Sequence, residues 1–519
     1  MEAQAPERLG TEFRVRVRVR RNLPIVAVAC ATALAACGGS TTASGDQAGA
    51  DPPIAAPPGD WTTFNFNAQR SGVGPAATGI TARNLDKLTV RRVQLDGTVD
   101  SSAIELHGIT VRGRARDVAV VTTTYGRTIA FDPGTGTRLW EFVPSDISSY
   151  QGSFRITNAT PLADPNRRYV YAASPDGLIH KLALGTGRQV RTGHWPVRVT
   201  FDPVHEKLGT ALNTSGSSVV VTTGGYIGDA PPYQGHVVMI NRSSGRITAV
   251  WNSLCSNVHR LMPPATCSAS DSAIWARAGA VIEPGSHRIL VATGNAPFNG
   301  VVNWGDSVLE LSPDARRLLH NWTPTNQAQL EAGDTDLGST APAILPPTSG
   351  YRLAVQGGKD GYLALLNLNK LNATRGGASP RTGGELQHIP TPGSDVVLTA
   401  PAVWTHGGQT MVFVANDSGT TAYALVGGSR PHLTVAAENS TPGTSPVVAG
   451  GLLYIYDERD GALKIYEPTG LRLLTSLPAA TGHWNSPIVV GGRIILPEGN
   501  ANDHNASSGT IDIYHLPGH

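Results

Sequence analysis

The sequence predicts an all-β fold, an eight-bladed β-propeller whose blades are four-stranded antiparallel sheets. Glycine and proline contribute 59 and 37 of the 519 residues, and charged residues only 15%. This composition is typical of short strands joined by tight turns, and it argues against long helices or a coiled coil. A unit of about 40 to 65 residues also recurs along the body of the chain, and each copy ends in a turn signal.

The first 36 residues are predicted to be a lipoprotein-type signal peptide. A basic stretch at residues 14–21 precedes an apolar run at 23–36, which is too short to span a bilayer but suits a signal peptide. The run ends in Leu-Ala-Ala-Cys at Cys37, which resembles a bacterial lipoprotein signal. The resemblance implies that Cys37 is acylated, and that a lipid anchor alone holds the exported chain on the extracytoplasmic side of a membrane. Ordinary secretion with a chance cysteine is the alternative.

Residues 37–59 are predicted to form a flexible tether, because small polar residues and prolines there cannot bury a core. The propeller is expected over residues 60–519. Without residues 1–36 the chain has 35 basic residues (41 less 6) and 36 acidic residues (39 less 3), a net charge of −1. A nucleic acid is therefore not expected as a partner.

Two cysteines, Cys255 and Cys267, remain after Cys37. Export places the chain in a compartment that permits disulfides, so we expect these two residues to form one. A metal or redox pair is the alternative, although no Cys-x-x-Cys spacing is present. No Cys-x-x-Cys-His motif occurs either, so the chain is expected to carry no c-type haem of its own.

The recurring unit combines a small residue and an apolar run with β-branched strands separated by glycine-rich turns. A single unit of this kind cannot bury both of its faces. A closed ring buries them against each other and leaves only short edges. The eight copies occupy residues 101–136, 158–187, 215–245, 277–314, 340–368, 399–425, 444–470 and 485–516.

Two further features fit a ring. The segment 85–95 precedes the first unit, and we expect it to pair with the last blade and fasten the circle. Four tryptophans follow turns that end blades, so we expect them to pack between neighbouring blades rather than bind a ligand: Trp140, Trp195, Trp251 and Trp322.

Together these residues resemble the quinoprotein dehydrogenase family, eight-bladed propellers with pyrroloquinoline quinone (PQQ) repeats. Asp60-Trp61 and the segment 67–70 resemble the family's opening segment, and the blade ends FDPGTG and INRSSG resemble its repeat. Residues 275–369 resemble its active-site half. The resemblance implies PQQ over the propeller axis, with Ca²⁺ bridging it to the protein. It also implies oxidation of an alcohol or sugar, with electrons passing to a separate acceptor.

The resemblance assigns roles to four residues. Asn295, in a Thr-Gly-Asn turn, would be a calcium ligand. Asp336 would accept the proton of the substrate hydroxyl and could also ligate the metal, and Asp334 could add a ligand or replace Asp336 as base. Lys359 would contact the quinone. The alternatives are structural: Asn295 could cap a blade turn, the aspartates could form Asx turns, and Lys359 could be a solvated hairpin tip.

Two positions depart from the family's pattern. Where the family has a calcium-binding glutamate this chain has Ala230, so the neighbouring Asp229 is predicted to be the metal ligand. The tryptophan that would lie under the quinone is also offset. Trp275 lies two residues too early and Arg277 takes the aligned place, so both are candidates for cofactor binding.

Two classes of function therefore stay open. The first is a dehydrogenase dependent on PQQ and Ca²⁺, or a degenerate relative of one. The second is a non-catalytic scaffold for protein–protein interaction, similar to the propeller lipoprotein of the outer-membrane assembly machinery. Binding of an extracellular polysaccharide is a third alternative that no residue specifically supports.

Overall fold

A computed structural model describes residues 59–371, 382–502 and 509–518 of the chain. The predicted signal peptide, Cys37 and the tether up to residue 58 lie outside the described residues. Within the described part, strands make up nearly all regular structure, and the only α-helix is α1 (Gln327–Ala332). Short 3-10 turns occur at Leu85–Lys87, Ile147–Ser149, Pro264–Thr266, Leu337–Ser339 and Pro392–Ser394. The all-β prediction is confirmed.

Eight four-stranded antiparallel sheets form the blades, as predicted. Blades 1 to 4 consist of β2 (Ile104–Val111), β3 (Arg114–Thr122), β4 (Thr128–Phe131) and β5 (Arg138–Phe142); β6 (Leu162–Ala163), β7 (Tyr169–Ser174), β8 (Leu178–Ala183) and β9 (Val197–Arg198); β11 (Asn213–Ser215), β12 (Ser218–Thr222), β14 (His236–Asn241) and β15 (Ile247–Asn252); and β16 (Val281–Ile282), β17 (Ile289–Ala292), β18 (Val308–Leu311) and β19 (Leu318–Trp322).

Blades 5 to 8 continue the ring in chain order. They consist of β20 (Ala343–Thr348), β21 (Tyr351–Gln356), β22 (Tyr362–Asn367) and β23 (Gln387–Pro390); β24 (Ala402–His406), β25 (Gln409–Asn416), β26 (Gly419–Val426) and β27 (His432–Asn439); β28 (Val447–Ala449), β29 (Leu452–Asp457), β30 (Ala462–Glu467) and β31 (Arg472–Pro478); and β32 (Ile488–Val490), β33 (Arg493–Glu498), β34 (Gly509–His515) and β1 (Thr89–Leu95).

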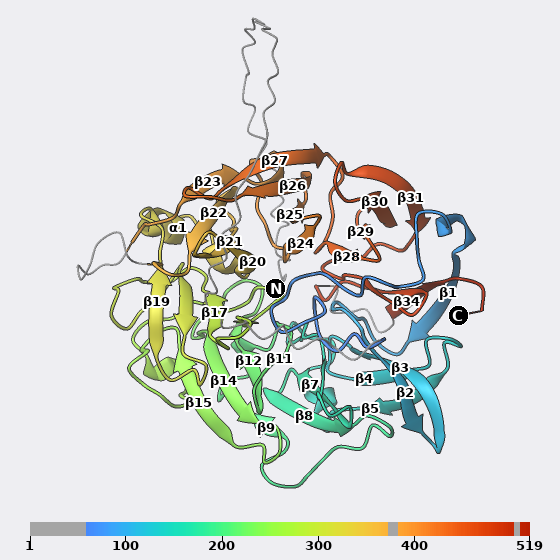
Figure 1. Ribbon diagram of the computed structural model, residues 1–519. Coiled ribbons are helices and arrows are strands. Elements are labelled where there is room, and N and C mark those ends of the chain that lie inside the picture. The colour runs from blue at the N-terminus through green and yellow to red at the C-terminus, as the bar shows by residue number, and fades with distance from the viewer. Residues whose placement is uncertain (1–58, 372–381, 503–508, 519) are drawn as a thin grey trace, which may run out of the picture. The chain divides into compact units, whose positions relative to one another are not determined.

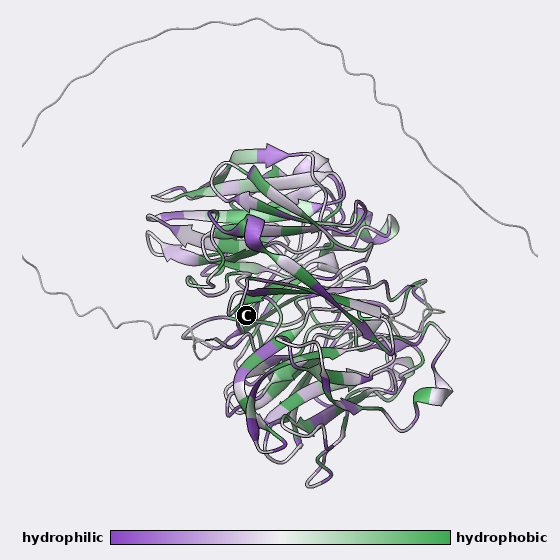
Figure 2. Cartoon of the chain, turned by 90° about the vertical axis from the view of Figure 1, so that its right-hand side faces the viewer, coloured by the Kyte–Doolittle hydropathy of each residue, from purple (hydrophilic) through white to green (hydrophobic). Residues whose placement is uncertain are grey.

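The first strand of a blade lies toward the centre of the ring and the fourth at its rim. Figure 1 shows this for β20, β24 and β28 against β23, β27 and β31. A separate two-stranded sheet, β10 (Glu206–Lys207) with β13 (Gly224–Gly225), lies outside the blades. Figure 2 shows hydrophobic residues on the strands of the stacked sheets, where neighbouring blades bury them.

The ring is closed by a strand from the start of the propeller, as the sequence predicted. β1 pairs with β34 along its whole length, from Thr89 opposite His515 to Leu95 opposite Gly509. Within this pair the Arg92 guanidinium donates two hydrogen bonds to the Asp512 carboxylate, at 2.7 and 2.6 Å. Joining two distant parts of the chain in one blade removes the open sheet edge that a linear array would leave.

A buried ion pair also links the last blade to the first. Arg493, at the start of β33, donates to the carboxylates of Glu105 on β2 (2.6 Å) and Asp117 on β3 (2.7 Å). The Glu105 side chain is fully buried. Burial raises its pKa, although the positive charge of Arg493 works against that shift.

The four tryptophans pack between blades, as predicted, and all are buried. Trp140 ends blade 1, and its indole Nε1 donates to the backbone oxygen of Leu184 in blade 2, at 2.7 Å. Gly187 faces the same ring with φ near +70°, and a Cβ there would lie 2.6 Å from the indole. Glycine is therefore required at this contact for both its backbone angle and its lack of a side chain.

The opening segment of the propeller is bound to several blades. Trp61 is fully buried and pairs through its backbone with Glu105 of blade 1. The Arg70 guanidinium donates to the backbone oxygens of Ala211 and Leu212 near blade 3 and of Ala278 near blade 4. Complete burial lowers the pKa of Arg70 to about 9. These contacts explain why tryptophan and arginine occur at those two places.

Cys255 and Cys267 form the predicted disulfide, which closes a loop with a sequence separation of 12 after β15. Nothing in the described part of the chain is a helix long and apolar enough to cross a membrane.

Candidate functional site

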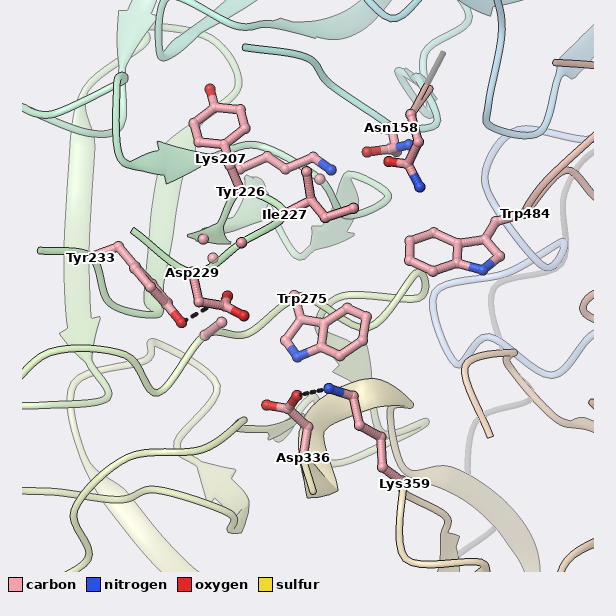
Figure 3. Close-up of a pocket in the computed structure, with 16 residues that line it drawn as sticks. Asn158, Lys207, Tyr226, Ile227, Asp229, Tyr233, Trp275, Asp336, Lys359 and Trp484 are labelled. Carbon is pink, nitrogen blue, oxygen red and sulfur yellow. Dashed lines mark hydrogen bonds and ion pairs between the residues drawn. The ribbon is translucent and has the colours of Figure 1, made fainter. Parts of the chain in front are cut away.

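A cavity of about 240 Å³ opens at one end of the ring (Figure 3). Its lining residues come from two kinds of loop, which the antiparallel order of a blade brings to the same end. One kind leads into the first strand of a blade, and the other joins the second strand to the third. The first kind supplies Asn158, Lys207, Trp275, Asp336 and Trp484, and the second supplies Asp229, Tyr233, Lys359 and Asn502.

Asp336 and Lys359 form the charged centre of the cavity. The Lys359 Nζ atom lies 2.5 Å from Asp336 Oδ2, and the two side chains are 26% and 12% exposed. Burial lowers the pKa of Lys359, but the carboxylates of Asp336, Asp334 and Asp229 together outweigh burial, and the pKa is raised. Lys359 therefore stays protonated at neutral pH and faces the cavity as a cation.

Asn295 joins this pair from blade 4, so the structure brings all three predicted residues together. Its backbone N–H donates to Asp336 Oδ1 at 2.9 Å. Gly294 makes this approach possible, because a Cβ there would lie 2.2 Å from the same carboxylate oxygen. The Leu337 N–H donates to the buried Asp306 at 3.1 Å and fixes the turn that carries Asp336.

The second predicted aspartate is more remote from the cavity. Asp334 has a side chain that is 76% exposed, and it does not line the cavity. Its Oδ1 atom accepts a hydrogen bond from Asn295 Nδ2 at 3.1 Å and lies 3.8 Å from Lys359 Nζ. Asp334 thus contributes charge near the site, and Asp336 is the better placed of the two to act as a base.

Asp229, predicted as the substitute for a missing glutamate, lines the cavity from blade 3. It accepts a hydrogen bond from the Tyr233 hydroxyl at 3.0 Å. Burial is the main cause that raises the pKa of Asp229, and the nearby negative charge of Asp336 adds to it. Two carboxylates that oppose each other's ionisation favour a cation between them.

Trp275 and Arg277, the two candidates for cofactor contact, face different surroundings. Trp275 lines the cavity, and Lys359 Nζ lies 5.6 Å from the centre of its indole ring. Arg277 is buried and does not line the cavity. Its guanidinium donates to the backbone oxygen of Asp100 at 2.6 Å and lies 5.5 Å from the ring of Trp484. Arg277 can therefore act on a ligand only through the residues around it.

The fit of calcium to these residues is incomplete. One observation favours a cation: the side-chain oxygen of Asn295 is buried without a hydrogen-bond partner. However, Ca²⁺ takes six to eight oxygen ligands, and the Lys359 ammonium already neutralises Asp336. Among the described residues, the only three His, Cys, Asp or Glu side chains within 4.8 Å of one another are Glu105, His107 and Asp117, away from this cavity. The arrangement as it stands does not fit calcium.

Sequence reasoning missed several lining residues, among them Asn158, Lys207, Tyr233 and Trp484. Trp484 faces Trp275, with ring centres 6.1 Å apart and planes tilted by 35°. A positional signal could have found two of them. Trp484 and Asn158 each stand just before the small residue and proline that open a repeat. Asp336 likewise precedes the small residue and proline that open the next repeat.

Comparison with known proteins supports this type of propeller. Residues 86–257 match a family model described as outer membrane protein assembly factor BamB. Among solved structures, the quinohemoprotein alcohol dehydrogenase of Comamonas testosteroni is similar, with a TM-score of 0.65 and 14% identity over 90% of this chain and 82% of that one. A europium-containing methanol dehydrogenase has a TM-score of 0.63 and 14% identity over 89% of this chain and 99% of that one.

At such low identity these likenesses show the fold alone. No curated protein matches the chain.

Proposed function

Because the chain is an eight-bladed propeller of the PQQ-repeat type, we propose that its axial cavity binds a quinone cofactor and serves an alcohol or sugar dehydrogenase. The observation that supports this most is the convergence of Asp336, Lys359 and Trp275, predicted from separate parts of the sequence, on one cavity. The chain shares its fold with a quinohemoprotein alcohol dehydrogenase and a methanol dehydrogenase, and we extend their type of chemistry to it as part of this proposal.

The cavity walls suit a flat aromatic ligand. Trp275 and Trp484 present two indole rings to the cavity, and offset or tilted aromatic contacts are favourable. Lys359 supplies a fixed positive charge that would lie against a quinone oxygen. A bound quinone would accept the hydride equivalent from the substrate carbon, and a separate acceptor would then take the electrons.

Asp336 is the proposed general base. It must accept the substrate's hydroxyl proton, and this requires an oxygen free of the Lys359 ammonium. Oδ1 receives the Asn295 N–H and Oδ2 receives Lys359. We therefore expect ligand binding to draw Lys359 away from Asp336, toward the ligand, which would leave the carboxylate basic.

Calcium enters the proposal only as a condition to be tested, with Asn295, Asp229 and Asp336 as its ligands. Because Lys359 already neutralises Asp336, the residues present predict that the chain retains the quinone without added calcium. A strict calcium requirement would show that Lys359 moves aside for the metal.

The test is reconstitution of the purified full chain. The protein is mixed with PQQ, with or without Ca²⁺, and passed through a desalting column, and its absorbance spectrum is recorded. Dye reduction is then measured with a panel of alcohols and sugars. We expect quinone to co-elute with the protein and Asp336→Asn to keep the quinone but lose dye reduction. The exposed control Asp460→Asn should keep both the quinone and dye reduction. Free passage of PQQ through the column would refute the proposal.

The second candidate is a scaffold that docks other proteins. It is favoured by the match of residues 86–257 to the BamB family model, and by the pairing of Asp336 with Lys359, which leaves the base neutralised. A chain that fails to bind quinone but associates stably with outer-membrane assembly proteins would support this candidate.

Both candidates place the propeller outside the cytoplasm, held by a lipid on Cys37. Residues 23–37 carry this part of the proposal. Mass spectrometry of the mature amino terminus tests it: an acylated Cys37 is expected, and a Cys37→Ser chain should be released from membranes. Cleavage elsewhere, with Cys37 unmodified, would refute the anchor.

A further inference from the structure

The cavity has a cationic end that the proposed roles do not use. Lys207 is the second residue of β10 and lies directly opposite Gly224 of β13. Residues opposite each other in an antiparallel pair point to the same face of the sheet. A Cβ on Gly224 would lie 3.0 Å from the Cβ of Trp275. Lys207 therefore lies on the same face of the two-stranded sheet as Trp275. It lines the cavity beside Gly224, which has no side chain.

Within the part of the chain that the structure describes, no carboxylate pairs directly with the Lys207 ammonium, although the charge of Asp100 acts on it through space. Among the described residues, its Nζ atom has no hydrogen-bond or ion-pair partner. Burial lowers the pKa of Lys207 to about 8; the Asp100 carboxylate opposes that shift and the Arg277 guanidinium adds to it. A partly buried cation without a hydrogen-bonded anion is unfavourable, and an anionic group of a ligand would relieve that cost.

The two ends of the cavity differ in charge. Figure 3 shows Lys207 reaching toward Asn158 on one side of Trp275, while the Asp336–Lys359 pair lies on the other side. Asp229 adds a second carboxylate to the cavity, and its charge interacts with those of Asp336 and Lys359. A ligand with a carboxylate at one end can therefore be bound in only one direction without placing like charges together.

We propose that Lys207 is an anion anchor, which binds a carboxylate of the ligand and fixes the ligand's direction along Trp275 and Trp484. This deepens the proposed function and rests on it where the ligand is PQQ, a flat tricarboxylate. The same carboxylate could also belong to an acid-bearing substrate that binds beside the quinone. In both cases the reactive group is held at the opposite end, next to Asp336 and Lys359.

The test compares Lys207→Gln with the wild-type chain and with a control, Lys464→Gln, whose lysine pairs with Asp457 in blade 7. The dissociation constant of PQQ is measured by quenching of tryptophan fluorescence. The trimethyl ester of PQQ, which has no carboxylate, is measured in the same way. Loss of one charge-assisted hydrogen bond should weaken PQQ binding by about tenfold to a hundredfold in Lys207→Gln. Binding of the ester should not change, and the control should resemble the wild type for both ligands.

A second arm identifies an acid-bearing substrate as the source of the carboxylate. The quinone-loaded chain is titrated with 4-(hydroxymethyl)benzoate and with benzyl alcohol. If the carboxylate belongs to the substrate, Lys207→Gln should keep its PQQ affinity and lose its preference for the benzoate. Equal behaviour of Lys207→Gln and wild type with PQQ and with the benzoate would overturn the anchor.

A third arm does not depend on the quinone. The full chain is acetylated at pH 8, and labelling of Lys207 is followed by mass spectrometry with and without benzene-1,3,5-tricarboxylate. Protection of Lys207, with Lys464 labelled equally in both samples, supports the anchor even if PQQ does not bind and the proposed function fails. If PQQ binds but neither PQQ nor the tricarboxylate protects Lys207, the anchor fails and the proposed function stands. If PQQ does not bind and the tricarboxylate gives no protection, both fail.

Discussion

Replacing Arg493 with methionine removes the guanidinium that joins the last blade to the first. The Arg493 side chain is 6% exposed and that of its partner Glu105 is fully buried. Breaking a buried ion pair from one side leaves an uncompensated charge, which typically costs about 3–5 kcal/mol. We expect Arg493→Met to lower the free energy of unfolding by about that amount, because Glu105 would keep only the His107 imidazole, 3.8 Å away, as a basic neighbour.

The loss should depend on pH in a defined direction. Burial already raises the pKa of Glu105, and removing Arg493 raises it further. At pH values between the ordinary pKa of glutamate and the raised pKa of Glu105, the Glu105 carboxyl is protonated in the native chain and ionised in the unfolded chain. Stability therefore rises as pH falls through that window. The deficit of Arg493→Met against the wild type should shrink between pH 7 and pH 5.

Urea unfolding followed by tryptophan fluorescence measures this effect. The control is Arg459→Met, which removes an exposed pair with Asp417 and should cost at most about 1 kcal/mol. The double variant Glu105→Gln/Arg493→Met should recover most of the loss. The reasoning is refuted if Arg493→Met costs no more than the control, or if its deficit is the same at both pH values.

Two further changes test the site and the loop that the disulfide closes. Gly294→Ala places a methyl group where Asp336 Oδ1 lies, so it should displace Asp336 and abolish quinone retention on a desalting column; Gly470→Ala, in an exposed turn with no atom closer than 3.5 Å, should retain it. Retention by both variants would contradict the geometry of the site. Replacing Cys255 and Cys267 with serine should lower the free energy of unfolding by about 3 kcal/mol, from loop entropy. A double variant as stable as the wild type in urea would show that the loop is held by other contacts.

The number of blades could be predicted because each blade of a propeller corresponds to one copy of a repeat in the sequence. Each unit carries its own strands and turns, so local patterns are enough to mark it. Closure by β1 was also predictable, since segment 85–95 has strand character and no partner within the first unit. The separate β10–β13 sheet was not foreseen, because two-residue strands containing Gly224 and Gly225 carry no alternating pattern.

The site was predictable only in part. Asn295, Asp336 and Lys359 stand in motifs, so each could be recognised from neighbouring residues. Trp484 lies 125 residues after Lys359 and Lys207 lies 88 residues before Asn295, and only the folded ring brings them to the cavity. A pattern within one unit does not state which loops from other blades complete the site.

A crystal structure of the full chain soaked with PQQ tests the central claim most directly. The account predicts a quinone in the axial cavity, packed against Trp275 and Trp484. One of its carboxylates binds the Lys207 ammonium, and a quinone oxygen contacts Lys359. A soaked crystal with that cavity empty of PQQ, or with PQQ bound only on the outer surface of the blades, would contradict it.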